Sequence, residues 1–174
     1  FQGIMAEALE RPGRRLKIYY ATKALVSADL VRSLHALGLG FDVSSRGEWE
    51  WTRRAGAPAA DIEYQGNNKS AAELRAAIQD GVGSIVIDSA QEVARIAEIA
   101  AEAGGVQEVL IRVNTGVHAG THEYLATARE DQKFGIARAD VADIAAQIAR
   151  HPELRLVGLH SHIGSQIVAP DGFV

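Results

Sequence analysis

Apolar residues along the chain alternate between two periodicities. Short runs rich in β-branched and aromatic residues are each followed by a longer stretch in which apolar residues recur every three or four positions. The short runs predict buried strands and the longer stretches predict amphipathic helices. The expected strands cover residues 16–23, 41–44, 62–66, 84–88, 109–114 and 154–160. Six strand-and-helix units of this kind predict a parallel sheet wrapped by helices.

Three of the expected helices begin with a serine that is followed three residues later by a glutamate. In such a capping box the hydroxyl accepts a hydrogen bond from a free backbone amide, and the carboxylate reaches back to the amide of the serine. The three pairs are Ser45 with Glu48, Ser70 with Glu73 and Ser89 with Glu92. Asp140 is expected to cap a further helix, after a polar stretch over residues 115–139 that interrupts the rhythm.

A parallel sheet of this kind is either an open, doubly wound sheet or a (β/α)8 barrel. A dinucleotide-binding sheet carries a glycine-rich G-x-G-x-x-G turn after its first strand, whereas here Thr22-Lys23-Ala24 stands at that place. The barrel is therefore favoured. A barrel of this type closes with eight strands. We expect an incomplete barrel, with two of its strands outside this sequence.

The amino-acid composition narrows the classes of function that suit this chain. The 174 residues are 47% hydrophobic and 23% charged, and they include no cysteine, so we expect no thiolate chemistry within one ordinary soluble domain. The formal net charge is −4 and basic residues are scattered, which is not the footprint of a nucleic-acid or membrane-surface protein. We expect small-molecule chemistry or protein contacts instead, in the cytoplasm. Residues 1–3, Phe-Gln-Gly, resemble the remnant of a cleavable tag, which leaves 4–174 as the domain.

Polar or ionisable residues stand at the carboxyl end of every expected strand. These ends lie on one face of a parallel α/β fold, where the chemistry is placed. The residues are Lys23, Asp42, the turn Asn67-Asn68-Lys69, Asp88, Arg112 with Asn114, and His160 with His162. Taken singly, Lys23 is also explained as a surface lysine, and Asp88 and Asn114 as loop or cap residues. Taken together, they predict a site.

The last strand adds the most specific chemistry. His160 and His162 share one side of the strand by its period of two, and Gly164-Ser165 follows as a permissive turn with a hydroxyl. An imidazole can stack on a flat aromatic ligand, and a serine in such a turn can bind a phosphate oxygen. A lysine amine that faces the same ligand can form a Schiff base with it.

Six motifs follow one another along the chain. They are Tyr20-Ala21-Thr22-Lys23-Ala24, Phe41-Asp42-Val43-Ser44, Gly66-Asn67-Asn68-Lys69-Ser70, Val86-Ile87-Asp88-Ser89, Glu130-Asp131-Gln132-Lys133-Phe134-Gly135 and His160-Ser161-His162-Ile163-Gly164-Ser165-Gln166. The same motifs occur in this order in the diaminopimelate decarboxylases, and the chain resembles that family over nearly its whole length. The resemblance is strongest to the actinobacterial enzymes.

The resemblance implies a barrel like that of alanine racemase, with pyridoxal phosphate as cofactor, that converts meso-diaminopimelate to lysine. It implies that Lys23 forms the Schiff base, that His162 stacks on the cofactor ring and that Ser165 contacts the phosphate. Arg112 and Asp42 match polar positions around the Schiff-base side. The family's phosphate loop and C-terminal β-domain have no counterpart in this sequence, so we expect the chain alone to be inactive and the full-length enzyme to be a homodimer.

Three alternatives remain open at this stage. His160-x-His162 with Lys23 as a modified bridging ligand would suit a metal-dependent barrel hydrolase. A barrel without the β-domain could be a non-catalytic pyridoxal-phosphate carrier, although the long polar stretch is more typical of a functional insertion. The substrate could also be ornithine or arginine, because the residues that read the far end of the substrate are not in this sequence.

Overall fold

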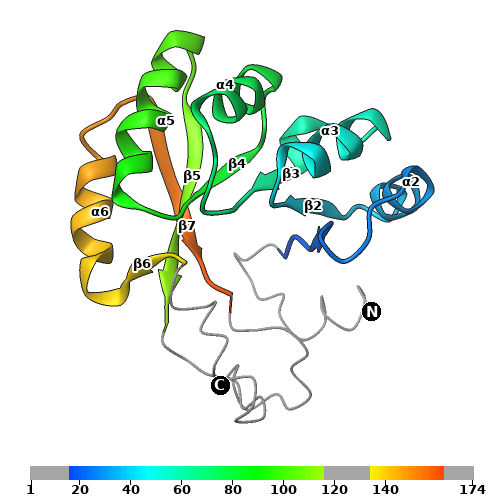
Figure 1. The fold of residues 1–174 in the computed structure, drawn as a ribbon, viewed down its shortest axis with the longest axis horizontal. Coiled ribbons are helices and arrows are strands. Elements are labelled where there is room, and N and C mark those ends of the chain that lie inside the picture. The colour runs from blue at the N-terminus through cyan, green and yellow to red at the C-terminus, as the bar shows by residue number, and fades with distance from the viewer. Residues whose placement is uncertain (1–15, 116–133, 163–174) are drawn as a thin grey trace. The chain divides into compact units, whose positions relative to one another are not determined.

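The computed structural model describes residues 16–115 and 134–162, and it divides the chain into two units. Unit 1 comprises Phe1–Tyr64 with Gly81–Gly83, and unit 2 comprises Gln65–Asp80 with Ser84–Val174. Both units are built from strands that alternate with helices (Figure 1). Each unit is described by itself below.

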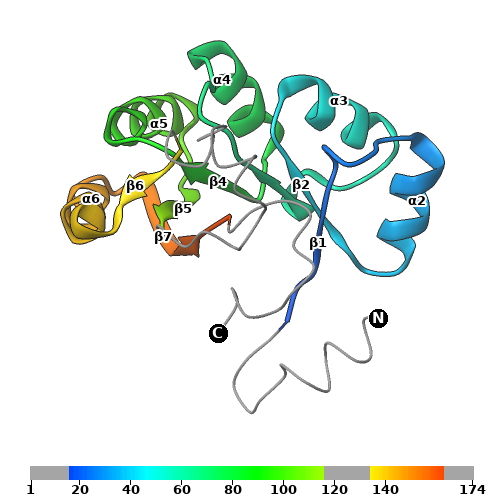
Figure 2. The ribbon, with the colours of Figure 1, turned by 60° about the horizontal axis from the view of Figure 1, so that its bottom comes forward.

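The described part of unit 1 contains parallel strands in chain order. Its elements are β1 (Tyr19–Ala21), α2 (Ala28–Ala36), β2 (Gly40–Val43), α3 (Arg46–Arg54), the 3-10 helix η1 (Ala59–Asp61) and β3 (Ile62–Tyr64). β1 pairs with β2 and β2 pairs with β3. Helices α2 and α3 lie side by side (Figures 1 and 2). The core is formed by Phe41, Val43, Ile62 and Tyr64, whose burial is the main favourable term in folding.

The described part of unit 2 continues the same alternation. Its elements are α4 (Ala71–Asp80), β4 (Ser84–Ile87), α5 (Ala90–Ala103), β5 (Gln107–Asn114), β6 (Ile136–Ala137), the 3-10 helix η3 (Arg138–Asp140), α6 (Val141–Ile148) and β7 (Leu154–His160). β5 pairs in parallel with β4 on one side and with β7 on the other. The short β6 pairs with the carboxyl end of β5, at Val113 and Asn114.

The helices of unit 2 favour the barrel over the doubly wound sheet. Strands β4, β5 and β7 follow one another in chain order, and α5 and α6 lie next to each other against β5 and β7 (Figure 1). Right-handed crossovers that proceed in one direction place all helices on one face of the sheet. A doubly wound sheet reverses its order and places helices on both faces. The side chains of β4 are buried along its whole length.

The predicted elements agree with the structure except at their ends and in the polar stretch. Strand β7 begins and ends where the sequence predicts, but β1 ends at Ala21, so Lys23 lies in the following turn. Asp140 is the N-cap residue of α6, as expected, although its side chain makes no cap hydrogen bond within the described residues. The sequence pattern does not predict β6, since two residues carry no periodicity.

Two further properties of the described residues concern the exposed side chains of β7 and the length and polarity of the helices. Strand β7 exposes apolar side chains, with Val157 47% and Leu159 62% accessible. In residues 16–115 and 134–162, every helix is too short or too polar to cross a membrane.

Candidate functional site

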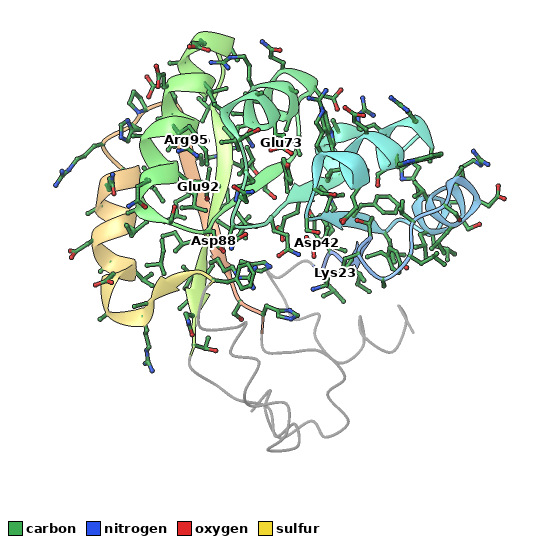
Figure 3. All side chains as sticks on the ribbon, in the orientation of Figure 1. Lys23, Asp42, Glu73, Asp88, Glu92 and Arg95 are labelled. Carbon is green, nitrogen blue, oxygen red and sulfur yellow. The ribbon has the colours of Figure 1, made fainter. Side chains whose placement is uncertain are left out.

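In unit 1 the candidate residue Lys23 lies in the turn after β1, and Asp42 lies on the neighbouring strand β2 (Figure 3). The backbone amide of Thr22 donates to the carbonyl of Asp42 at 2.9 Å, which holds the turn after β1 against β2. The Lys23 side chain is exposed, and its amine makes no hydrogen bond or ion pair with any described residue. An amine in this state is open to reaction with an aldehyde once it loses its proton.

The first helix turn of α3 supports this arrangement through Glu48. Its Oε2 accepts hydrogen bonds from the Thr22 hydroxyl at 2.7 Å and from the Ser44 amide at 2.9 Å. Its Oε1 accepts from the Ser44 hydroxyl at 3.0 Å. Ser45 Oγ accepts from the Glu48 amide at 3.3 Å, as the capping box predicts. The carboxylate, however, binds the residue before the cap and the turn after β1 in place of the cap amide.

Helix α5 of unit 2 departs from the capping box in the same way. Glu92 Oε2 accepts from the amide of Asp88, the residue before the cap, at 2.8 Å. Ser89 makes no side-chain cap hydrogen bond within the part of the chain that the structure describes. In α4 the predicted box is confirmed, because Glu73 accepts from the Ser70 amide at 2.9 Å.

A buried ion pair occupies the other oxygen of Glu92. Lys69 Nζ lies 3.0 Å from Glu92 Oε1, and the two side chains are 1% and 4% accessible. The Lys69 amine also donates to the carbonyl of Gly66, and the carbonyl of Lys69 accepts from Arg95 Nη1 at 3.4 Å. Burial lowers the pKa of Lys69, although the attraction of Glu92 opposes this. The ammonium is therefore fixed within unit 2 and shielded from solvent.

Arg112 lies at the centre of the polar residues of unit 2. It is buried on β5, and its Nη1 donates to Gln65 Oε1 at 3.2 Å. Its Nε lies 3.7 Å from Asp88 Oδ1, and its guanidinium stands 4.9 Å from the centre of the Phe134 ring. Asp88 Oδ1 is buried and makes no hydrogen bond with the described residues. This leaves an acceptor for a polar ligand beside a guanidinium of fixed orientation.

The candidate histidines share unit 2 with Arg112. His160 is the last residue of β7 and lies opposite Arg112 in the pairing of β5 with β7. His162 follows two residues later and is partly buried. The turn with Ser165 lies outside the described residues. The structure thus brings Lys23 together with Asp42, and Arg112 together with Asp88 and His160, each group within its own unit.

Each group by itself carries chemistry that suits the cofactor that the sequence predicts. In unit 1, the exposed amine of Lys23 is of the kind that reacts with an aldehyde such as that of pyridoxal phosphate. In unit 2, the buried guanidinium of Arg112 and the carboxylate of Asp88 are polar groups that suit a polar ligand. Nowhere in 16–115 and 134–162 do three or more histidines, aspartates or glutamates converge as a metal site would need. The metal alternative gains no support from these residues.

The sequence pattern does not predict the side chains that hold the candidate residues in place. Gln65, Thr22 and the long-range contacts of Glu48 and Glu92 were not predicted as part of the site. Only the serine-to-glutamate spacing pointed to the two glutamates, and it predicted a local role.

Comparisons with known proteins give a consistent result. Residues 4–174 match the family described as "Pyridoxal-dependent decarboxylase, pyridoxal binding domain". The diaminopimelate decarboxylase of Mycobacterium tuberculosis is 48% identical over 163 residues, which are 92% of this chain and 36% of that protein. The Bacillus subtilis enzyme is 38% identical over 170 residues, 97% of this chain and 39% of that protein. The chain thus spans little more than a third of the length of these relatives.

Among solved structures, the diaminopimelate decarboxylase of Helicobacter pylori complexed with L-lysine is similar with a TM-score of 0.85. It is 29% identical, and the match covers 98% of this chain and 43% of that chain. The likeness therefore extends through both units of the fold.

Proposed function

Because the chain belongs to the pyridoxal-binding domain family of the pyridoxal-dependent decarboxylases, we propose that it is the cofactor-binding part of a diaminopimelate decarboxylase. The observation that carries the proposal is the 48% identity to the Mycobacterium tuberculosis enzyme over 92% of this chain. The proposed reaction is the removal of carbon dioxide from meso-2,6-diaminopimelate to give L-lysine.

The family membership settles three expectations. It confirms the resemblance inferred from the six motifs, the α/β fold of the barrel decarboxylases, and pyridoxal phosphate as the cofactor of the family. The preference for a pyridoxal-phosphate enzyme over a metal-dependent hydrolase rests on this membership.

We assign the following roles to the candidate residues. When bound, pyridoxal phosphate supplies an electron-accepting ring that takes up the charge left by a departing carboxylate. Lys23 would bind the cofactor through its amine. Arg112 would present a positive charge whose orientation is fixed by Gln65 and Asp88. His162 would pack on the ring, and Asp42 would act near Lys23.

The remaining roles extend beyond the described residues. Ser165 would bind the phosphate through its hydroxyl. We propose residues 4–174 as part of the barrel domain of a longer, cytoplasmic and homodimeric enzyme with an amino-acid substrate and no nucleic-acid or membrane partner. Ornithine or arginine as substrate is the alternative outcome of the assay below.

The test uses the full-length protein with pyridoxal phosphate, borohydride and peptide mass mapping. We expect a stable adduct on Lys23 that Lys23→Ala abolishes. Lys17→Ala is the matched control, because Lys17 is a nearby exposed lysine that is already paired with Asp61 at 2.9 Å. Retention of the adduct in Lys23→Ala would contradict the assignment. Release of carbon dioxide from ornithine or arginine in preference to diaminopimelate would refute the proposed substrate.

A further inference from the structure

The turn that carries Lys23 is bound from the side by a residue of another element. Glu48 Oε2, in the first turn of α3, accepts from the Thr22 hydroxyl at 2.7 Å. The same hydroxyl lies 3.1 Å from the carbonyl of Asp42. A hydroxyl has one proton, and the shorter contact to an ionised acceptor is the stronger one. Thr22 is only 2% accessible, so water does not compete easily for this bond.

Helix capping alone does not require this contact. In α4, Glu73 Oε2 accepts from the amide and the hydroxyl of Ser70, the cap of its own helix, at 2.9 and 2.6 Å. Glu48 instead binds Ser44 and Thr22, so one carboxylate joins the end of β2 to the turn after β1. Glu92 of α5 likewise binds the residue before its cap, but of these three glutamates Glu48 is the one that binds Thr22, the residue directly before Lys23.

We propose that Glu48 and Thr22 are positioning residues that fix the backbone of the Lys23 turn for attachment of the cofactor. The inference rests on the proposed function, because it presumes that Lys23 binds the cofactor. Lys23 itself is exposed and without a partner among the described residues, so its own side chain does not fix the turn. Thr22 precedes it directly and is anchored twice, by its amide on Asp42 and by its hydroxyl on Glu48. A small misplacement of a reacting group is enough to slow its reaction by orders of magnitude.

The experiment compares the rate at which the full-length apoprotein forms the borohydride-stable adduct with pyridoxal phosphate. Thr22→Val removes the hydroxyl with little change of volume, and Thr22→Ser retains it. We expect Thr22→Val and Glu48→Gln each to slow adduct formation by about tenfold or more. Thr22→Ser is expected to restore most of the rate. Glu73→Gln, the matched control, should react at the wild-type rate.

The outcomes separate this inference from the proposed function. If wild-type protein forms the Lys23 adduct and Thr22→Val forms it equally fast, the positioning role is wrong and the proposed function stands. If wild-type protein forms no adduct on Lys23, the proposed function fails and the inference fails with it.

Thermal unfolding of each variant is measured in parallel. If Thr22→Val forms the adduct slowly but unfolds at the wild-type melting temperature, the positioning role is supported. If Thr22→Ser loses as much of the rate of adduct formation as Thr22→Val, the positioning role is overturned. Should Thr22→Val not fold, Glu48→Gln decides, and a wild-type rate in that variant overturns the inference.

Discussion

The buried pair of Lys69 and Glu92 offers a sharp test of the electrostatics of unit 2. Both side chains are almost fully removed from solvent, and their charged atoms are 3.0 Å apart. Lys69→Met keeps a long apolar side chain but leaves the carboxylate of Glu92 buried without a cation. Glu92→Gln leaves the ammonium without its carboxylate. The double variant removes both charges.

The expected magnitudes follow from the burial. Removing one partner of a buried pair costs about 3 to 5 kcal/mol, because the remaining charge is neither solvated nor compensated. This is a large part of the roughly 5 to 15 kcal/mol that stabilises a domain. The double variant should cost less than the sum of the two single variants, because no unpaired charge remains. Arg75→Met is the control, since the pair of Arg75 and Glu102 is exposed and is expected to contribute about 1 kcal/mol or less.

The pH dependence has a definite sign. Burial lowers the pKa of Lys69 in the folded protein, and Glu92 opposes the shift. In Glu92→Gln that opposition is lost, so the pKa falls further. Below the folded pKa the lysine is charged in both states and the cost of burying it is fully present. Between the folded pKa and the ordinary value of about 10.4, only the unfolded state holds the proton, so stability rises with pH.

Urea unfolding of the full-length protein at several pH values measures both effects. The loss of stability in Glu92→Gln should shrink as the pH rises through the alkaline range. Lys69→Met has no amine to titrate and should lack this recovery. Single variants that each lose less than about 1 kcal/mol would show that the ion pair is not buried as described. A loss in Glu92→Gln that grows with pH would refute the direction of the Lys69 pKa shift.

Two further substitutions test packing and the site. A β-carbon at Gly40 would lie 2.7 Å from the Tyr19 ring and 2.9 Å from the Asp61 carbonyl. Gly40→Ala should therefore lower the free energy of unfolding, measured in urea, by about 1 to 3 kcal/mol. Gly47→Ala is the control, because its β-carbon meets nothing within 4 Å and should not destabilise α3. His162→Ala should weaken pyridoxal-phosphate binding to the full-length protein and greatly lower its turnover. Unchanged turnover would mean that the ring does not stack there.

The sequence was sufficient for the elements because their signals are local. The alternation of apolar residues predicted the core strands, and three serine-to-glutamate pairs correctly placed the starts of α3, α4 and α5. The ends of strands were less certain. β1 is three residues long and stops before Lys23, because the pairing with β2 ends there and the chain turns.

Contacts between distant residues could not be predicted in this way. The spacing of Ser45 and Glu48 is the same whether the carboxylate returns to its own cap or reaches Thr22, 26 positions earlier. The pairing of Glu92 with Lys69 likewise depends on how α5 packs beside the turn that follows β3 in the chain. Such partners are set by tertiary structure and leave no periodic trace.

Lys23 and Lys69 lie in the loops that follow β1 and β3 in the chain, and they illustrate how environment assigns a role that residue type leaves open. Lys69 is enclosed and paired with Glu92, so to attack an aldehyde it would have to lose its proton, break a buried ion pair and leave a carboxylate without a counter-charge. Lys23 faces solvent with no partner among the described residues, and only its backbone is restrained, through Thr22. A restrained backbone with a free amine suits a group that must bind and release a cofactor. Attachment at Lys23 is therefore favoured over attachment at Lys69, and peptide mapping of the borohydride adduct distinguishes the two directly.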